Sequence, residues 1–391
     1  MTTSITTPDY AVHGLVSLSE FLEDRVVFRD LQPVDRRYQG FIQCARDFAL
    51  DPSDIPRKTD PDYNKVAVWI VDHMQEQRSD TEIQELLFVG DTRGSDLVAF
   101  EKMITYADWK GSCFIGDEAL HEEPELRWEI HPLLVSANRW SLIAEWIEGL
   151  AEARMAMDSR TAVIVDIDKT AIGAQGRNHQ VINDARVMSL RKSLEVHMSA
   201  NFDFQNFRRV YDQISRPEFQ GLTVDNEDYI IYICLMIMGG VTNIKEIGDL
   251  VAQRMSFLHL VRWISTKTDK PLVMQLRQLH DQYQMCTRTG DRTPFKQFRR
   301  QEFLETTGRM GIHSSPMAAA KRLESEICIT QEVRELCDWL NERGCLLLAM
   351  SDKPKEASMP HQRWHKGMLP VHRTPTHAVG TSIRERLDAL N

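Results

Sequence analysis

Residues 162–170 read AVIVDIDKT, a short apolar run that ends in two acidic residues and a threonine. A continuous apolar run of this length is typical of a strand in a parallel sheet that helices cover on both faces. Asp166 follows the run directly, at the carboxyl end of the predicted strand. Because ligands of open parallel sheets gather beyond that edge, this stretch predicts both a fold class and the position of a functional site.

Three further apolar runs have the same form, and each ends at a small residue followed by an acidic one. They are residues 86–89 before Gly90-Asp91, 113–115 before Gly116-Asp117, and 346–350 before Ser351-Asp352. Residues 376–379 form a weaker fifth candidate. Helical patterns precede two of the strands, at 140–150 and 330–340. This alternation predicts an α/β protein, a three-layer α/β/α sandwich with a parallel sheet.

Residues 172–328 differ in character, with long helical patterns such as 244–264 and 272–285 and no convincing strand. We interpret them as a mostly helical insertion between two neighbouring strands of the sheet. The predicted domains are therefore 1–171, the N-terminal part of the α/β core; 172–328, the insertion; and 329–391, the C-terminal part of the core. A chain of 391 residues is long enough for two or three cores.

The net charge of −10 argues against broad binding to nucleic acid polymers or anionic membranes, which requires an excess of Lys and Arg. No apolar run is long enough to span a bilayer, and the N-terminus lacks the features of a secretory signal. The seven cysteines include no CxxC pair and are interpreted as reduced residues, most of them in the core. We therefore expect a cytoplasmic protein of unknown oligomeric state.

Acidic or hydroxyl side chains end four of the predicted strands, at Asp91, Asp117, Asp166 and Ser351. Carboxylates gathered at one sheet edge repel each other unless a cation joins them, and hard oxygen ligands favour Mg²⁺. A carboxylate is also a competent nucleophile that can form an aspartyl-phosphate. The sequence therefore predicts a magnesium site at this edge of the sheet, with a carboxylate that is able to act as a nucleophile.

The segment DIDKT, residues 166–170, resembles the first motif, DxDxT, of the haloacid dehalogenase superfamily. The resemblance implies that Asp166 attacks phosphorus and that Asp168 is the general acid and base. It also implies that Thr170 and Ser351, which matches the second motif, hold the substrate phosphate. Relatives that cleave carbon–halogen bonds lack the second Asp, so Asp168 favours phosphate esters.

Residues 90–96, GDTRGSD, resemble the fourth motif of the same family, GDxxxxD. The resemblance implies that Asp91 or Asp96 completes a Mg²⁺ site, directly or through water. The other ligands would be the carboxylate of Asp166 and the backbone carbonyl of Asp168.

Lys58 resembles the lysine of the third motif, which neutralises the nucleophile and the phosphate, and Lys353 is an alternative for that role. In the family the third and fourth motifs follow the first two. Here the segments around Lys58 and Asp91 come before Asp166. A circular permutation accounts for this order if the chain opens after the third strand, here 376–379.

In the family the first strand is central, with the second and third strands on one side and the fourth and fifth on the other. We therefore expect 162–165 at the centre, 346–350 and 376–379 on one side, and 86–89 and 112–115 on the other. The permutation requires the Asp91 and Asp166 carboxylates to lie within about 8 Å, because each ligand oxygen lies about 2 Å from Mg²⁺. The insertion takes the place of the family's cap domain.

Together these features predict a Mg²⁺-dependent phosphatase, a hydrolase acting on a small phosphorylated metabolite or nucleotide. A basic stretch in the insertion contains Arg288 and Arg292, interpreted either as part of a solvated helix face or as contacts to an anionic substrate group. Two alternatives stay open: a phosphotransferase with an acceptor other than water, and a binding protein that keeps the fold without catalysis.

Overall fold

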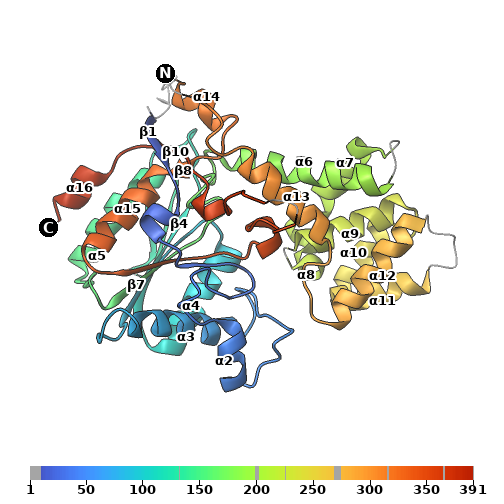
Figure 1. Cartoon of the computed structure of the whole chain (residues 1–391), viewed down its shortest axis with the longest axis horizontal. Coiled ribbons are helices and arrows are strands. Elements are labelled where there is room, and N and C mark those ends of the chain that lie inside the picture. Colours follow the sequence, from blue (N-terminus) through green and yellow to red (C-terminus); the bar gives the residue numbers. More distant parts are fainter. Residues whose placement is uncertain are drawn as a thin grey trace. The chain divides into compact units, whose positions relative to one another are not determined.

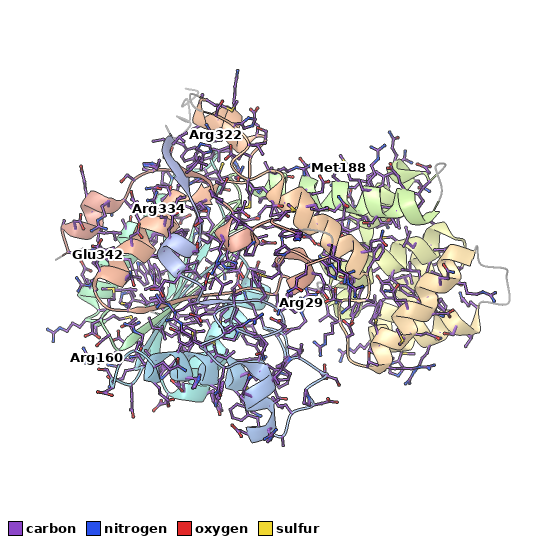
Figure 2. The ribbon with its side chains drawn as sticks, in the orientation of Figure 1. Arg29, Arg160, Met188, Arg322, Arg334 and Glu342 are labelled. Carbon is purple, nitrogen blue, oxygen red and sulfur yellow. The ribbon has the colours of Figure 1, made fainter. Side chains whose placement is uncertain are left out.

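The structure, a computed structural model, describes residues 10–131, 133–198, 202–224, 226–267, 274–314, 317–363 and 366–390. The chain divides into two compact units. The first contains the described residues up to Val187 and those from Glu302 onward, and the second runs from Met188 to Gln301. The chain crosses between the units within two helices, α6 (His179–Met198) and α13 (Lys296–Thr307), and Figure 2 labels Met188 on α6.

Within the described ranges, the first unit contains a seven-stranded sheet (Figure 1). Its strands are, in spatial order, β2 (Val26–Val27), β9 (Leu346–Met350), β7 (Thr161–Val165), β3 (Glu85–Gly90), β4 (Lys110–Gly116), β6 (Leu134–Ala137) and β5 (Leu126–Ile130). Neighbouring strands are parallel, except that β5 pairs antiparallel with β6. The AVIV run in β7 lies between β9 and β3, which confirms the predicted order of these three strands.

A second sheet corrects one of the predictions. The run at 376–379 forms β10 (Thr376–Gly380), but β10 lies in a separate sheet with β1 (Ala11–Val16) and β8 (Ile329–Thr330). The prediction that this run is the third strand of the main sheet is therefore wrong. The place beside β9 belongs to β2, whose two valines are fully buried.

The polar side chains of β10 account for its place in the smaller sheet. The Thr376 hydroxyl donates to a carboxylate oxygen of buried Glu326, and Nδ1 of His377 lies 2.6 Å from the same oxygen. Both side chains thus find hydrogen-bond partners that an apolar strand of the main sheet would not offer.

Helices cover both faces of the main sheet. The helices lying wholly in the first unit are α1 (Ser19–Leu22), α2 (Phe41–Asp47), α3 (Tyr63–Glu76), α4 (Val98–Ala107), α5 (Ile143–Glu152), α14 (Ala319–Leu323), α15 (Gln331–Glu342) and α16 (Arg384–Asp388). Successive strand residues point to opposite faces, so Val163 packs in the core beneath α5 and α15, and Ile164 packs in the core beneath α3 and α4. The unit is a mixed α/β structure with a mostly parallel sheet between helices.

The described part of the second unit contains helices and no strand. Besides parts of α6 and α13, its helices are α7 (Phe204–Ile214), α8 (Gln220–Thr223), α9 (Glu227–Met238), α10 (Ile244–Ala252), α11 (Phe257–Thr266) and α12 (Met274–Arg288). They enclose a separate core in which α9 is largely buried. The predicted insertion, 172–328, is wider than this unit, because 172–187 and 302–328 belong to the first unit.

The helices of both units share one property. In the ranges that the structure describes, none is long and apolar enough to cross a lipid bilayer.

Candidate active site

The predicted site residues follow three neighbouring strands of the main sheet. Asp91 comes directly after β3, Asp166 after β7 and Ser351 after β9. Because these strands are parallel, their carboxyl ends meet at one edge, which brings together residues that are far apart in the sequence. Asp117, which follows β4, is exposed and is not part of the acidic group at this edge.

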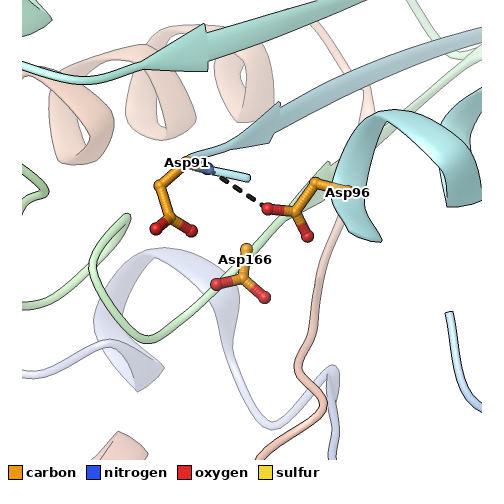
Figure 3. A group of neighbouring side chains, drawn as sticks. All are labelled: Asp91, Asp96 and Asp166. Carbon is orange, nitrogen blue, oxygen red and sulfur yellow. Dashed lines mark hydrogen bonds between the residues drawn. The ribbon is translucent and has the colours of Figure 1, made fainter. Parts of the chain in front are cut away.

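Three carboxylates form the centre of the site (Figure 3). Asp91, Asp96 and Asp166 each offer one oxygen, and these oxygens all lie within 4.8 Å of one another. This separation satisfies the condition of about 8 Å for carboxylates that share one Mg²⁺ ion. Asp96 and Asp166 are buried, at 1% and 7% exposed, so water screens their charges little.

Asp96 joins the group because the chain turns back after β3. Residues 93–97 form a single π-helical turn, and Oδ2 of Asp96 accepts hydrogen bonds from the N–H groups of Asp91 (3.2 Å) and Thr92 (3.0 Å). Gly90 permits this approach, since a Cβ at that position would lie 2.5 Å from Oδ2 of Asp96. The glycine of the GDxxxxD pattern therefore has a steric reason in this chain.

Lys58 links two of the acids. Its Nζ donates hydrogen bonds to Oδ1 of Asp166 and to Oδ1 of Asp96, both at 2.6 Å, from a side chain that is 2% exposed. Lys353, the alternative lysine, instead donates to Oδ2 of Asp168 at 2.8 Å. Of the two lysines, Lys58 is therefore the one that contacts the predicted nucleophile.

Burial and repulsion control the ionisation of these groups. Burial raises the pKa of Asp91 to about 7, and the charge of Asp96 adds to the effect. Burial also raises the pKa of Asp166 well above its usual range, although Lys58 opposes this shift. Burial would lower the pKa of Lys58, but the carboxylates of Asp166 and Asp96 outweigh it and raise that pKa. Lys58 contacts two of the three acids, and the charge of Lys169 also lowers the pKa of the third, Asp91. A further cation would stabilise this group of buried acids.

Asp168 and Thr170, which follow Asp166 closely in the sequence, each carry a buried side-chain oxygen without a hydrogen-bond partner among the described residues. Among the described residues, Oδ1 of Asp168 and Oγ1 of Thr170 are buried and make no hydrogen bond. Between them the chain turns sharply, with Lys169 at a positive φ of 66°. Because buried polar atoms normally have a hydrogen-bond partner, these two atoms are candidates to contact a bound molecule.

Ser351 is buried at the end of β9. Its Oγ accepts a hydrogen bond from the N–H of Lys353 at 3.2 Å, and as an acceptor there the hydroxyl can still donate its own proton. The N–H of Ser351 donates to the carbonyl of Val27 in β2. The hydroxyl, rather than this N–H, is therefore the group that could hold a phosphate.

Sequence reasoning missed Arg57 as a site residue. Its Nη2 lies 3.2 Å from Oδ2 of Asp352, and Arg29, labelled in Figure 2, donates to the carbonyl of Asp352 at 2.6 Å. Burial would raise the pKa of Asp352, but the charges of Arg57 and Lys58 lower it on balance. The signal in the sequence was only that Arg57 stands directly before Lys58.

The two arginines predicted to contact substrate belong to the second unit. Arg288 is the last residue of α12, and the carbonyl of Arg292 accepts a hydrogen bond from Nδ2 of Asn226 at 2.8 Å. Their contact with a substrate stays a prediction.

Comparisons of the chain with protein-family models, with curated proteins and with solved structures gave no significant match. The resemblance to the haloacid dehalogenase superfamily therefore stays a prediction that depends on the motif residues.

Proposed function

We propose that this protein is a Mg²⁺-dependent phosphatase that hydrolyses a small phosphomonoester through an aspartyl-phosphate. One observation supports the proposal above the others. Asp166 lies at the carboxyl end of β7, held by buried Lys58, with the Asp91 carboxylate close by. A nucleophile, a cation for the phosphoryl oxygens and a metal ligand thus converge on one point.

The donor atoms fit a magnesium ion. All three acids offer oxygen, which Mg²⁺ prefers. Both oxygens of Asp96 already accept hydrogen bonds from the protein, so Asp91 and Asp166 would supply the direct carboxylate ligands and Asp96 would orient them. When bound, Mg²⁺ would favour the ionised form of both ligands and offset the charge of an incoming phosphate.

The reaction requires two proton transfers, both at Asp168. In the first step an oxygen of Asp166 forms a bond to phosphorus, the ester P–O bond breaks, and the proton of Asp168 moves to the leaving oxygen. In the second step water attacks the aspartyl-phosphate and gives its proton back to Asp168, which releases phosphate and restores Asp166. Lys58, Thr170 and Ser351 would hold the phosphoryl oxygens.

The test is release of phosphate from a generic aryl phosphate, with Mg²⁺ and with excess chelator. Asp166→Asn should abolish turnover and leave the circular dichroism spectrum unchanged. The matched control is Asp117→Asn, an exposed acid at the end of β4, which should keep wild-type activity. Turnover retained by Asp166→Asn would contradict the mechanism.

A further inference from the structure

Asp168 belongs to a second group of ion pairs in the first unit. Nζ of Lys353 lies 2.8 Å from Oδ2 of Asp168 and 3.5 Å from Oε1 of Glu302. Arg186 contacts the same two acids, at 3.6 Å from Oδ2 of Asp168 and 3.2 Å from Oε1 of Glu302. The four side chains therefore form a closed ring in which positive and negative charges alternate.

The ring is largely buried. The side chains of Glu302 and Lys353 are 1% and 2% exposed, and those of Asp168 and Arg186 are 16% and 18% exposed. Charges removed from water in this way stay in place only while they remain paired. Both cations approach Oδ2 of Asp168, while its Oδ1 is the buried oxygen without a partner among the described residues. The ring thus holds one oxygen and leaves the other without a hydrogen bond among the described residues.

Two ring members lie where the chain passes between the units. Arg186 is on α6, one residue before the first unit ends at Val187, and Glu302 on α13 is the residue at which that unit resumes. The contact between them joins the two connecting helices. The orientation of Asp168 therefore depends on side chains outside the family-like motifs.

We infer, on the basis of the proposed function, that Arg186 and Glu302 are positioning residues that orient Asp168 for proton transfer to the leaving oxygen. Because both cations face Oδ2 of Asp168, the proton that this residue donates must sit on Oδ1. As the bond from Asp166 to phosphorus forms and the ester P–O bond breaks, that proton moves to the departing oxygen. An alkoxide is a poor leaving group and needs this proton, whereas a nitrophenolate departs without it. Misplacement of Asp168 should therefore slow the hydrolysis of alkyl phosphate esters and change the hydrolysis of activated aryl esters little.

The experiment measures kcat/KM of the full-length protein with Mg²⁺ on an alkyl phosphate and on p-nitrophenyl phosphate. The value of kcat/KM depends only on the steps up to departure of the leaving group. The later hydrolysis of the aspartyl-phosphate therefore does not affect it. The variants are Arg186→Met and Glu302→Gln. Matched controls are Arg191→Met, also on α6, and Glu305→Gln, also on α13, whose ion-pair partners are Glu195 and Arg309.

We expect both variants to lose on the order of 10- to 100-fold in kcat/KM on the alkyl ester and less than about threefold on the aryl ester. The controls should match wild type on both. Equal losses on the two esters, or no loss on either, would overturn the inference alone. A wild-type protein inactive on both esters would overturn the proposed function as well. If Glu302→Gln does not fold, the result for Arg186→Met tests the inference. Arg186 is the most exposed member of the ring, so its replacement should disturb folding least.

Discussion

Nζ of Lys58 donates a 2.6 Å hydrogen bond to Oδ1 of Asp166, across 108 residues of sequence. The same ammonium group reaches Asp96 at the same distance. Neither contact could form unless the segment before β3 folds back over the carboxyl end of β7. The site is therefore a product of the tertiary fold, and its residues can be tested through stability as well as through activity.

Replacement of Lys58 by Met should destabilise the protein by about 3–5 kcal/mol, because it leaves buried carboxylates without their cation. Urea unfolding measures this loss. The double variant Lys58→Met with Asp96→Asn should recover part of the lost free energy of unfolding, because it removes one of the two carboxylates left without a cation. Full additivity of the two changes would contradict the direct pairing of Lys58 with Asp96.

Magnesium should stabilise the folded protein and so raise its thermal unfolding temperature. At a magnesium concentration a hundred times Kd, the free energy of unfolding should rise by about 2.7 kcal/mol. Asp91→Asn should abolish this stabilisation, because Asp91 supplies one of the two direct carboxylate ligands in the proposed site. Without magnesium the same variant should be more stable than wild type, since it relieves repulsion from Asp96 and Asp166. An equal response of Asp91→Asn and wild type to magnesium would exclude the site.

Gly90→Ala should weaken magnesium binding, because the added Cβ would lie 2.5 Å from Oδ2 of Asp96 and displace that carboxylate. Titration calorimetry measures the effect. Gly248→Ala is the control: it lies within α10, nothing lies within 4 Å of the added Cβ, and alanine should stabilise the helix by about 0.5–1 kcal/mol.

His372 should make the protein sensitive to mild acid. Its side chain is fully buried, with its ring tilted against that of Phe28. Burial lowers its pKa below the ordinary 6.5 even though Asp24 lies 3.2 Å away. Below pH 6.5 the unfolded chain therefore binds a proton that the folded state does not, so the free energy of unfolding falls as pH falls. His372→Gln should flatten this slope below pH 6.5, measured by urea unfolding at each pH.

Much of the fold could be predicted because a strand buried on both faces must be continuously apolar. The runs that became β3, β4, β7 and β9 satisfy that rule. Their predicted order was what the resemblance to the family implies. The two-residue strand β2 is too short to produce a pattern. Because β2 was not predicted, the run at 376–379 was assigned to the position beside β9.

The candidate site could be proposed from the sequence where a motif requires a particular residue at a particular spacing, as at Asp166, Asp168 and Asp91. It was not predictable where a charge acts through space. Arg186 and Glu302 are ordinary charged residues of helices, and only the tertiary fold brings them to Asp168. For the same reason no spacing in the sequence distinguishes Lys58 from Lys353.

The pairing of β2 with β9 has a consequence for how the protein is made. A ribosome that has released Val27 must still translate past Leu346 before this edge strand has a partner, which takes on the order of tens of seconds. Until then β7 is an open edge of the growing sheet, ready to pair with any extended segment. A nascent chain stalled before β9 should therefore be a target for chaperones, and a truncation at that point should aggregate.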